Sequence, residues 1–450
     1  MAFNTIKFGL AVLSKQRQFK ARQHWTRRQF DEYQTHELRR LRDFAYANSP
    51  FYEEFHKGYY DAPLHELPVL TKSALMEHFD TLVTDRNIRL QDIEAYIADP
   101  RRTGLFRGEF TINVTAGTSG RTAVVVFSSA ERATCMAGAF TYTPMNLSLT
   151  RRSRLAQVAS ATTFHMSAMG GATLRSLLMP GLILAASEPL PEMVAKLNEW
   201  KPKVLVVYPS IGRILADEQL AGRLHIAPRD VLCGSEPLTG ETRRRMAQAW
   251  GDRIFNNYAA TECAGIAIEC GQHRGMHVVE DLVIVENVDR NNQPVPDGVY
   301  GDKLLVTSLF KRAQPIIRYE IEDSVRFSKA ACPCGRPTKL IDSVQGRMQD
   351  VLSFPAKAGG SVSVHPLVFH SIIDVLPVSG WQVVQEADGL HILLSGVHGA
   401  VDDEQLKHLA QNALASQGAL VPPVAVQRVM SIPQTVVGKT PLVKSNLPRT

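Results

Sequence analysis

Short β-branched segments alternate with helical segments between residues 101 and 344, and this alternation restricts the fold more than any other feature of the chain. The segments expected as strands include residues 204–208 (VLVVY), 230–233 (DVLC) and 303–307 (KLLVT). Strands that alternate with helices are typical of α/β domains, in which helices cover the faces of a sheet. The sequence therefore predicts an α/β fold with helix-covered sheets for this part of the chain.

The pattern changes after residue 346, where the remaining segments indicate a smaller unit. An apolar hairpin with its turn near residue 388 is followed by a helix expected over about 402–415 and by one more strand. A chain of 450 residues suggests two or three domains, at roughly 150 residues each. We therefore predict a large domain over residues 1–345 and a small α+β domain over residues 346–450.

The composition is that of an ordinary globular protein, with 44% apolar residues, 21% charged residues and a formal net charge of +6. No basic stripe is interleaved with aromatic residues, so we expect no nucleic acid partner. No apolar run is long enough to span a bilayer or to form a secretory signal, and six cysteines without such a signal fit the reducing cytoplasm. The apolar run at residues 8–13 could pack on its own domain or on a second subunit, which leaves a homodimer open.

Residues 115–122 (TAGTSGRT) combine glycines with hydroxyl-bearing side chains just before the apolar run at 124–127. Glycines let the backbone turn and approach a ligand closely, and successive N–H groups and hydroxyls can surround an anion. The loop matches neither of the common phosphate-loop patterns, G-x-x-x-x-G-K-[ST] and G-x-G-x-x-G between a strand and a helix. Taken alone, it fits an anion-binding loop and an ordinary polar hairpin equally well.

Further motifs follow this loop: YAATE at residues 258–262, RYEIED at 318–323, GR at 346–347 and GK at 438–439. In this order, the loop and these motifs resemble the adenylate-forming superfamily of acyl- and aryl-CoA synthetases, and most closely its phenylacetate–CoA ligase branch. The resemblance covers nearly the whole chain. It implies a large N-terminal adenylate-forming domain and a small, mobile C-terminal domain that rotates between two half-reactions.

The resemblance also implies an activity and a set of binding residues. ATP and Mg²⁺ would adenylate a small-molecule carboxylic acid, aromatic or arylacetic, and the acyl group would then pass to CoA. The residues that correspond to the nucleotide site are Thr115, Gly117, Thr118, Ser119, Gly120, Arg121, Ser235, Glu236, Pro237, Tyr258, Asp323 and Arg347. Those expected around the acid are Phe164, His165, Tyr208, Ala259 and Ala260.

Three residues are expected to take part directly in the chemistry. Lys439 would bridge the carboxylate and the α-phosphate as a point charge. Thr261 would offer its hydroxyl to the α-phosphate, and Glu262 would supply a carboxylate oxygen to Mg²⁺, a cation that prefers oxygen ligands.

Some positions depart from the superfamily pattern. Thr122 stands where Pro is usual, Ile321-Glu322 where Thr-Gly is usual, and Gln349 where the hinge residue is normally acidic or Lys. The departures at Ile321-Glu322 and Gln349 keep a second hypothesis open, that of a catalytically silent member that acts as a scaffold or sensor. A third hypothesis is an enzyme that passes the acyl group to an amine or to a carrier-protein thiol instead of CoA.

The cysteines suggest a metal site apart from the nucleotide motifs. Cys270 and His273 form a C-x-x-H pair, and Cys332 and Cys334 form a C-x-C pair. Three thiols and one imidazole match the tetrahedral donor set of structural Zn²⁺, in which four protein ligands leave no open position for chemistry. His277 is the alternative to His273, and two unrelated pairs of thiols are the alternative to a metal site.

Overall fold

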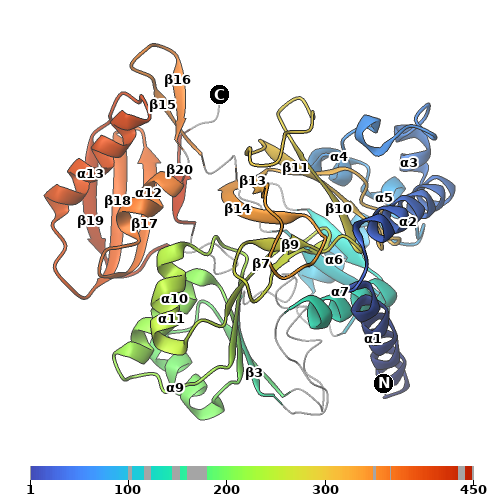
Figure 1. Ribbon diagram of the computed structural model, residues 1–450, viewed down its shortest axis with the longest axis horizontal. Coiled ribbons are helices and arrows are strands. Elements are labelled where there is room, and N and C mark those ends of the chain that lie inside the picture. Colours follow the sequence, from blue (N-terminus) through green and yellow to red (C-terminus); the bar gives the residue numbers. More distant parts are fainter. Residues whose placement is uncertain are drawn as a thin grey trace.

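The computed structural model describes residues 2–99, 104–115, 123–143, 153–159, 180–347, 351–364, 366–433 and 441–447. Within these residues, the chain forms a large mixed α/β unit and a smaller unit near its C-terminal end (Figure 1). The largest sheet has nine strands in the order β13-β14-β9-β8-β7-β6-β5-β3-β4. This sheet positions most of the candidate site residues described below.

One half of the nine-stranded sheet is parallel, and helices connect its strands. Its strands are β3 (Leu155–Ala159), β4 (Gly181–Ala185), β5 (Val204–Val207), β6 (Asp230–Gly234) and β7 (Ile254–Ala260). Its helices are α9 (Leu190–Trp200), α10 (Pro209–Leu220) and α11 (Gly240–Trp250). Parallel strands need long crossover connections, and these helices supply them from β4 to β5, from β5 to β6 and from β6 to β7, while the connection from β3 to β4 lies outside the described residues. The predicted alternation of strands and helices is confirmed.

The other half of this sheet is antiparallel, and the change occurs between β7 and β8. Its strands are β8 (Ala264–Glu269), β9 (Met276–Val278), β13 (Asp323–Phe327) and β14 (Leu340–Arg347). A second sheet contains β10 (Val283–Val288), β11 (Lys303–Ser308) and β12 (Tyr319–Ile321). Buried residues of both sheets share one hydrophobic cluster, so the two sheets form a single core.

Helices dominate the N-terminal part of the large unit. They are α1 (Ala2–Arg22), α2 (Arg27–Asn48), α3 (Pro50–Phe55), the 3₁₀ turn η1 (Leu64–Glu66), α4 (Lys72–Glu77), α5 (Phe79–Leu82), α6 (Leu90–Ala98) and α7 (Ser129–Tyr142). Helix α1 packs on α7 through Val12 and Phe19, while Leu10 is 61% exposed. The apolar run at residues 8–13 therefore packs on its own unit along one face. None of the helices among the described residues combines the length and the apolarity needed to cross a membrane.

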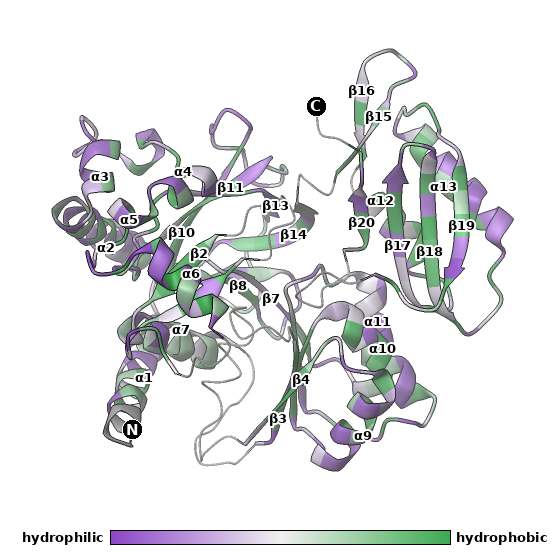
Figure 2. Cartoon of the chain, turned by 180° about the vertical axis from the view of Figure 1, so that it is seen from behind, coloured by the Kyte–Doolittle hydropathy of each residue, from purple (hydrophilic) through white to green (hydrophobic). Residues whose placement is uncertain are grey.

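The C-terminal unit is a small α+β structure, as expected. A four-stranded sheet, in the order β19-β18-β17-β20, contains β17 (Val378–Glu386), β18 (Gly389–Val397), β19 (Val424–Val429) and β20 (Val443–Ser445). It is accompanied by α12 (Leu367–Ile373), α13 (Asp403–Ser416) and a hairpin of β15 (Leu352–Pro355) and β16 (Ser361–Val364). Figure 2 shows hydrophobic residues concentrated along β18, and the buried cluster of this unit lies entirely between residues 352 and 443.

A buried histidine in the N-terminal part makes stability depend on pH. His56 is 0% exposed, and burial together with the positive charge of Arg42 lowers its pKa from 6.5 to about 4. The unfolded chain therefore binds a proton on this residue more readily than the folded chain does. The resulting loss of stability begins as the pH falls through about 6.5 and is complete near pH 4.

We expect this histidine to make the free energy of unfolding about 2 kcal/mol lower at pH 5 than at pH 7.5. Urea unfolding at the two pH values would measure the difference. His56→Gln should remove this part of the pH dependence, whereas the exposed His36→Gln should retain it. An unchanged pH dependence in His56→Gln would contradict the prediction.

Candidate functional site

The anion-binding loop predicted from the sequence connects two antiparallel strands, β1 (Thr111–Val114) and β2 (Val124–Phe127). At its base, the Thr115 N–H donates to the carbonyl of Ala123 at 2.9 Å, and the Ala123 N–H donates to Thr115 Oγ1 at 2.8 Å. A hairpin is not the strand–loop–helix unit of a dinucleotide fold, in agreement with the sequence analysis. The predicted nucleotide residues Gly117, Thr118, Ser119, Gly120 and Arg121 lie outside the described residues.

The fold brings the predicted adenine and ribose residues together. Tyr258 lies near the carboxyl end of β7, and Asp323 begins β13 at the far edge of the same sheet. The Tyr258 hydroxyl donates to Asp323 Oδ2 at 2.6 Å. A carboxylate has about four acceptor positions and can accept more than one hydrogen bond. An aromatic ring and a carboxylate thus lie side by side, as nucleoside recognition requires.

Glu262, the predicted Mg²⁺ ligand, follows β7 directly and is held in place by a tyrosine. Its side chain is buried, and its Oε1 accepts a hydrogen bond from the Tyr319 hydroxyl at 2.8 Å. Thr261 lies in the turn between β7 and β8, next to Glu262. The carboxylate therefore has a fixed orientation at the end of the strand that also carries Tyr258.

Two residues near this carboxylate were not identified from the sequence. Tyr319 belongs to the RYEIED motif, which served only to align Asp323, and nothing in the sequence indicates that its hydroxyl reaches Glu262. Lys311 is 0% exposed, donates to the carbonyl of Val126 and lies 3.6 Å from the centroid of the Phe127 ring. Its burial lowers the pKa of its ammonium group, while the nearby Glu131 and Glu262 charges oppose this shift.

The predicted adenine-side loop follows β6 and contains a residue with an unusual backbone conformation. Ser235 has φ +69°, in the left-handed region that L residues seldom adopt. Such conformations persist only where the surrounding structure enforces them, and they are frequent at functional sites. Next to it, Glu236 Oε2 accepts a hydrogen bond from the Ser210 N–H at 3.1 Å, which ties this loop to the start of α10. Pro237 continues the same loop.

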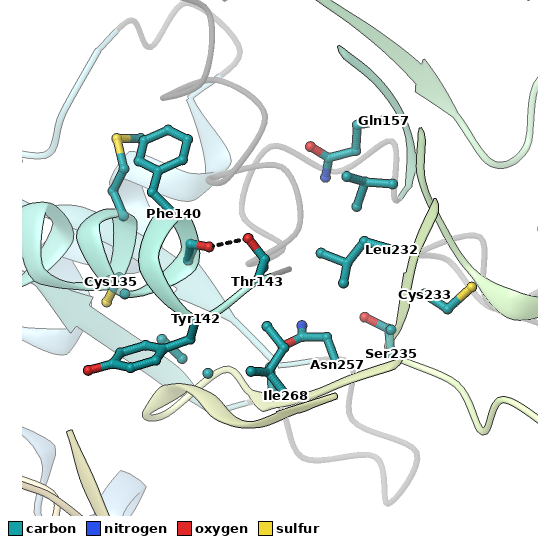
Figure 3. A pocket seen from close by; sticks show the side chains of 18 of the residues that line it. Cys135, Phe140, Tyr142, Thr143, Gln157, Leu232, Cys233, Ser235, Asn257 and Ile268 are labelled. Atoms are coloured by element: carbon teal, nitrogen blue, oxygen red, sulfur yellow. Dashed lines mark hydrogen bonds between the residues drawn. The ribbon is translucent and has the colours of Figure 1, made fainter. Parts of the chain in front are cut away.

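A cavity of about 250 Å³ lies between α7 and the strands β3, β6, β7 and β8 (Figure 3). Tyr208 and Ala259, both predicted to contact the acid, line it, whereas Ala260 packs against the hydrophobic core instead. Phe164 and His165 lie outside the described residues. The side chains labelled in Figure 3 are Cys135, Phe140, Tyr142, Thr143, Gln157, Leu232, Cys233, Ser235, Asn257 and Ile268.

The sequence analysis missed the contribution of α7 to this cavity. Cys135 of α7 lines the cavity, as does Cys233, which is also part of a hydrophobic core cluster. The small pair Gly138-Ala139 of α7 also lines the cavity, but small residues on a helix do not by themselves indicate one. The walls of the cavity are mainly apolar, and Gln157 and Asn257 are among the polar exceptions. Such a cavity suits a ligand that is largely apolar.

The predicted zinc site is present as a cluster, but with a different histidine. The ligand atoms of Cys270, His277, Cys332 and Cys334 all lie within 4.8 Å of one another. Cys270 Sγ is 3.6 Å from Cys332 Sγ, and His277 Nε2 is 3.2 Å from Cys334 Sγ. His277 Nδ1 is 3.1 Å from the Thr338 hydroxyl, an outer contact that orients a ligating imidazole.

The prediction of His273 as a zinc ligand was wrong. His273 lies in a turn with φ +50°, and its ring stacks on Phe255 at 5.2 Å between centroids. Its Nδ1 is 3.2 Å from Arg243. His277 instead lies on β9, where pairing with Leu340 of β14 brings it beside the cysteine pair that precedes that strand.

The donor set fits the metal. In a tetrahedral site with Zn–S bonds of about 2.3 Å, sulfur atoms lie roughly 3.7 Å apart, close to the separation of Cys270 and Cys332. Burial also lowers the pKa of His277 to about 4, which keeps its imidazole neutral, the form that binds a metal.

The remaining predicted residues belong to the C-terminal part of the site. Arg347 is the last residue of β14, and its side chain lies outside the described part of the chain, as does Gln349. Lys439 also lies outside it, in the segment between β19 and β20.

The comparisons with known proteins agree with this geometry. Residues 109–307 match the family described as AMP-binding enzyme. This segment is similar to AMP-binding domains. The resemblance to adenylate-forming enzymes, identified above from the motifs, is thereby confirmed.

Relatives of known function are phenylacetate–coenzyme A ligases. That of Thermus thermophilus is 28% identical over 207 residues, which are 44% of this chain and 45% of that protein. That of Pseudomonas putida is 32% identical over 170 residues, 36% of this chain and 37% of that protein. The matched part of this chain thus spans less than half the length of these relatives.

Solved structures show the same fold over most of the chain. A 2-hydroxyisobutyryl-CoA ligase in its postadenylation state, in complex with 2-HIB-AMP, has a TM-score of 0.74 and 19% identity. The match covers 94% of this chain and 91% of that protein. The large α/β unit and the small α+β unit are therefore those of the adenylate-forming ligase fold.

Proposed function

We propose that this protein is an AMP-forming ligase that joins a carboxylic acid to CoA. In the first step, a carboxylate oxygen would attack the α-phosphate of ATP, giving acyl-AMP and pyrophosphate. In the second, the CoA thiolate would attack the acyl carbon and release AMP. The observation that carries the proposal is the hydrogen bond from Tyr258 to Asp323, with the buried Glu262 just after the strand that carries Tyr258, in a segment that matches AMP-binding enzymes.

Each group would act through its charge or its hydrogen bonds. Asp323 would accept the ribose hydroxyls while Tyr258 packs against the adenine. Glu262 would hold the Mg²⁺ that accompanies ATP, and Thr261 would donate to the α-phosphate. Lys439, assigned from its place in the sequence, would neutralise the charge that develops between the carboxylate and the α-phosphate.

We also propose that residues 1–345 and 346–450 act as two domains.

The acid would be aromatic or arylacetic. Phenylacetate–CoA ligases are the relatives that match this chain, and the mainly apolar cavity of about 250 Å³ suits a ring.

We further propose that Cys270, His277, Cys332 and Cys334 hold a structural Zn²⁺. Bound there, the ion would join β8 and β9 to the segment before β14 and take no part in the reaction.

ATP–pyrophosphate exchange across aromatic, arylacetic and short aliphatic acids tests this proposal. We expect exchange only with acids of the right class, and loss of it in Lys439→Ala. Lys407→Ala, on the surface of α13, is the matched control and should retain exchange. Acid-independent formation of ADP would contradict the proposal, and acyl transfer to an amine without CoA would reject CoA as the acceptor.

A further inference from the structure

The small C-terminal unit is fastened to the large unit by a buried arginine. Arg213 lies in the first half of α10 and is only 6% exposed. Its Nη2 donates to the carbonyl of Leu376 at 3.0 Å, and its Nη1 is 3.9 Å from Asp374 Oδ1. Both partners lie between α12 and β17, so one side chain spans the contact between the units.

Asp374 is held by side chains of both units, since His370 and Trp381 belong to the small unit and Thr239 caps α11 of the large unit. Its Oδ1 accepts a hydrogen bond from the indole of Trp381 at 2.9 Å, and its Oδ2 lies 3.2 Å from His370 Nδ1. Burial opposes the charge on Asp374, but hydrogen bonds from His370, Thr239 and Trp381 lower the pKa of its carboxyl overall. Arg213 therefore meets a charged carboxylate of fixed orientation.

The side of the large unit that carries Arg213 is closely packed. A Cβ atom added to Gly212 would lie 2.6 Å from Met246 Sδ, so α10 and α11 are in direct contact at this point. A second contact lies nearby, where Arg245 Nη2 is 3.2 Å from His398 Nε2 of the small unit. Figure 1 shows the small unit beside α10 and α11.

One ligase with the same fold has been solved in two states, and the two units of this chain are arranged more like one of these states than the other. The TM-score is 0.74 against 2-hydroxyisobutyryl-CoA ligase in the postadenylation state and 0.61 against the same ligase in the thioesterification state. Coverage of this chain is 94% and identity is 19% in both comparisons. The lower score therefore arises from how the parts are placed relative to one another.

We propose that Arg213 is a positioning residue that holds the small unit in the orientation for adenylation and must release Asp374 and Leu376 before thioester formation. The proposal rests on the two-step function given above. Arg213 touches no reacting atom and would act by placing the segment that carries Lys439. Removing Arg213 takes away the side chain that joins α10 to Asp374 and to the carbonyl of Leu376, so the effect on the orientation should be large.

The two half-reactions, measured separately, test this role. In Arg213→Ala we expect acid-dependent pyrophosphate exchange to fall about tenfold or more, while thioester formation from synthetic acyl-AMP and CoA is retained or faster. Arg213→Lys, which keeps the charge but lacks the planar fork, should fall in between. Arg244→Ala, which removes an exposed arginine of α11 paired with Glu241, is the control and should change neither step. Equal losses in both steps would overturn the proposal.

Two further measurements keep the outcome unambiguous. Asp374→Asn preserves the size of the side chain and removes its charge, so it should reproduce the split between half-reactions even if Arg213→Ala folds poorly. Small-angle scattering of the protein without ligands should give a larger radius of gyration for Arg213→Ala than for the wild type. An unchanged scattering curve would reject the positioning role, whereas a wild-type protein that adenylates no acid would reject the proposed function alone.

Discussion

Glu262→Gln is expected to lower acid-dependent ATP–pyrophosphate exchange by about 100-fold or more, with little change in stability. Glutamine keeps the size of the side chain and can still accept the hydrogen bond from Tyr319. It lacks the charge that a hard cation carrying phosphate oxygens requires. The exchange rate should therefore fall because Mg²⁺ and the triphosphate are no longer held together, and the Mg²⁺ concentration needed for half-maximal rate should rise.

Two further variants test whether the charge of Glu262 itself, rather than its hydrogen bond to Tyr319 or the loss of any carboxylate, accounts for the effect. Tyr319→Phe removes the hydroxyl that orients Glu262 but leaves the carboxylate, so exchange should fall by less than about tenfold. Glu199→Gln removes an exposed carboxylate on α9 and should have no effect. Wild-type exchange and an unchanged Mg²⁺ dependence in Glu262→Gln would show that this carboxylate is not a metal ligand.

The second large effect is expected at the cysteine cluster. We expect the purified protein to contain one zinc ion per chain, measured by mass spectrometry of the metal, and His277→Gln to lose it. Because a structural zinc ion contributes directly to folding, the free energy of unfolding should fall by about 3 kcal/mol or more in that variant. Cys332→Ser should behave in the same way, since it removes another of the four ligands.

His273→Gln provides the matched control for this prediction. His273 is near His277 in sequence but stacks on Phe255, so its replacement should leave the zinc content unchanged. Loss of zinc in His273→Gln with retention in His277→Gln would reverse the assignment of the ligands. Protein that binds no zinc, even when the ion is added after reduction of the thiols, would reject the site.

Local pattern was enough to predict much of the fold. The strands at β5, β6 and β11 and the hairpin of β17 and β18 follow from runs of apolar residues and turn residues, which act over a few positions. The order of strands in the large sheet could not be predicted from local pattern, because the pairing of strands such as β14 and β9 depends on the whole chain. Sequence spacing therefore favoured His273 as the ligand, whereas strand pairing selects His277.

In the candidate site, too, some features could be predicted from local motifs and others could not. Tyr258, Asp323 and Glu262 were identified from motifs, but the hydrogen bond between Tyr258 and Asp323 joins strands β7 and β13, which are far apart in the sequence. Tyr319 and the wall of the cavity formed by α7 were missed, because neither a supporting hydroxyl nor a gap beside a helix leaves a distinct pattern in sequence. Arg213 was not identified for a similar reason, since an arginine on a helix is usually a surface residue.

The short connection between the two units has a consequence for how strong their contact needs to be. Four residues separate the end of β14 at Arg347 from the start of β15 at Leu352, and fully extended they reach at most roughly 14 Å. A tether of this kind keeps its two ends at an effective concentration in the millimolar range. The two units can therefore stay in contact for much of the time, even with surfaces that would bind each other only at about millimolar concentration as separate molecules. In the proposed two-step reaction, a contact that is maintained by the tether would also let the units part between the half-reactions.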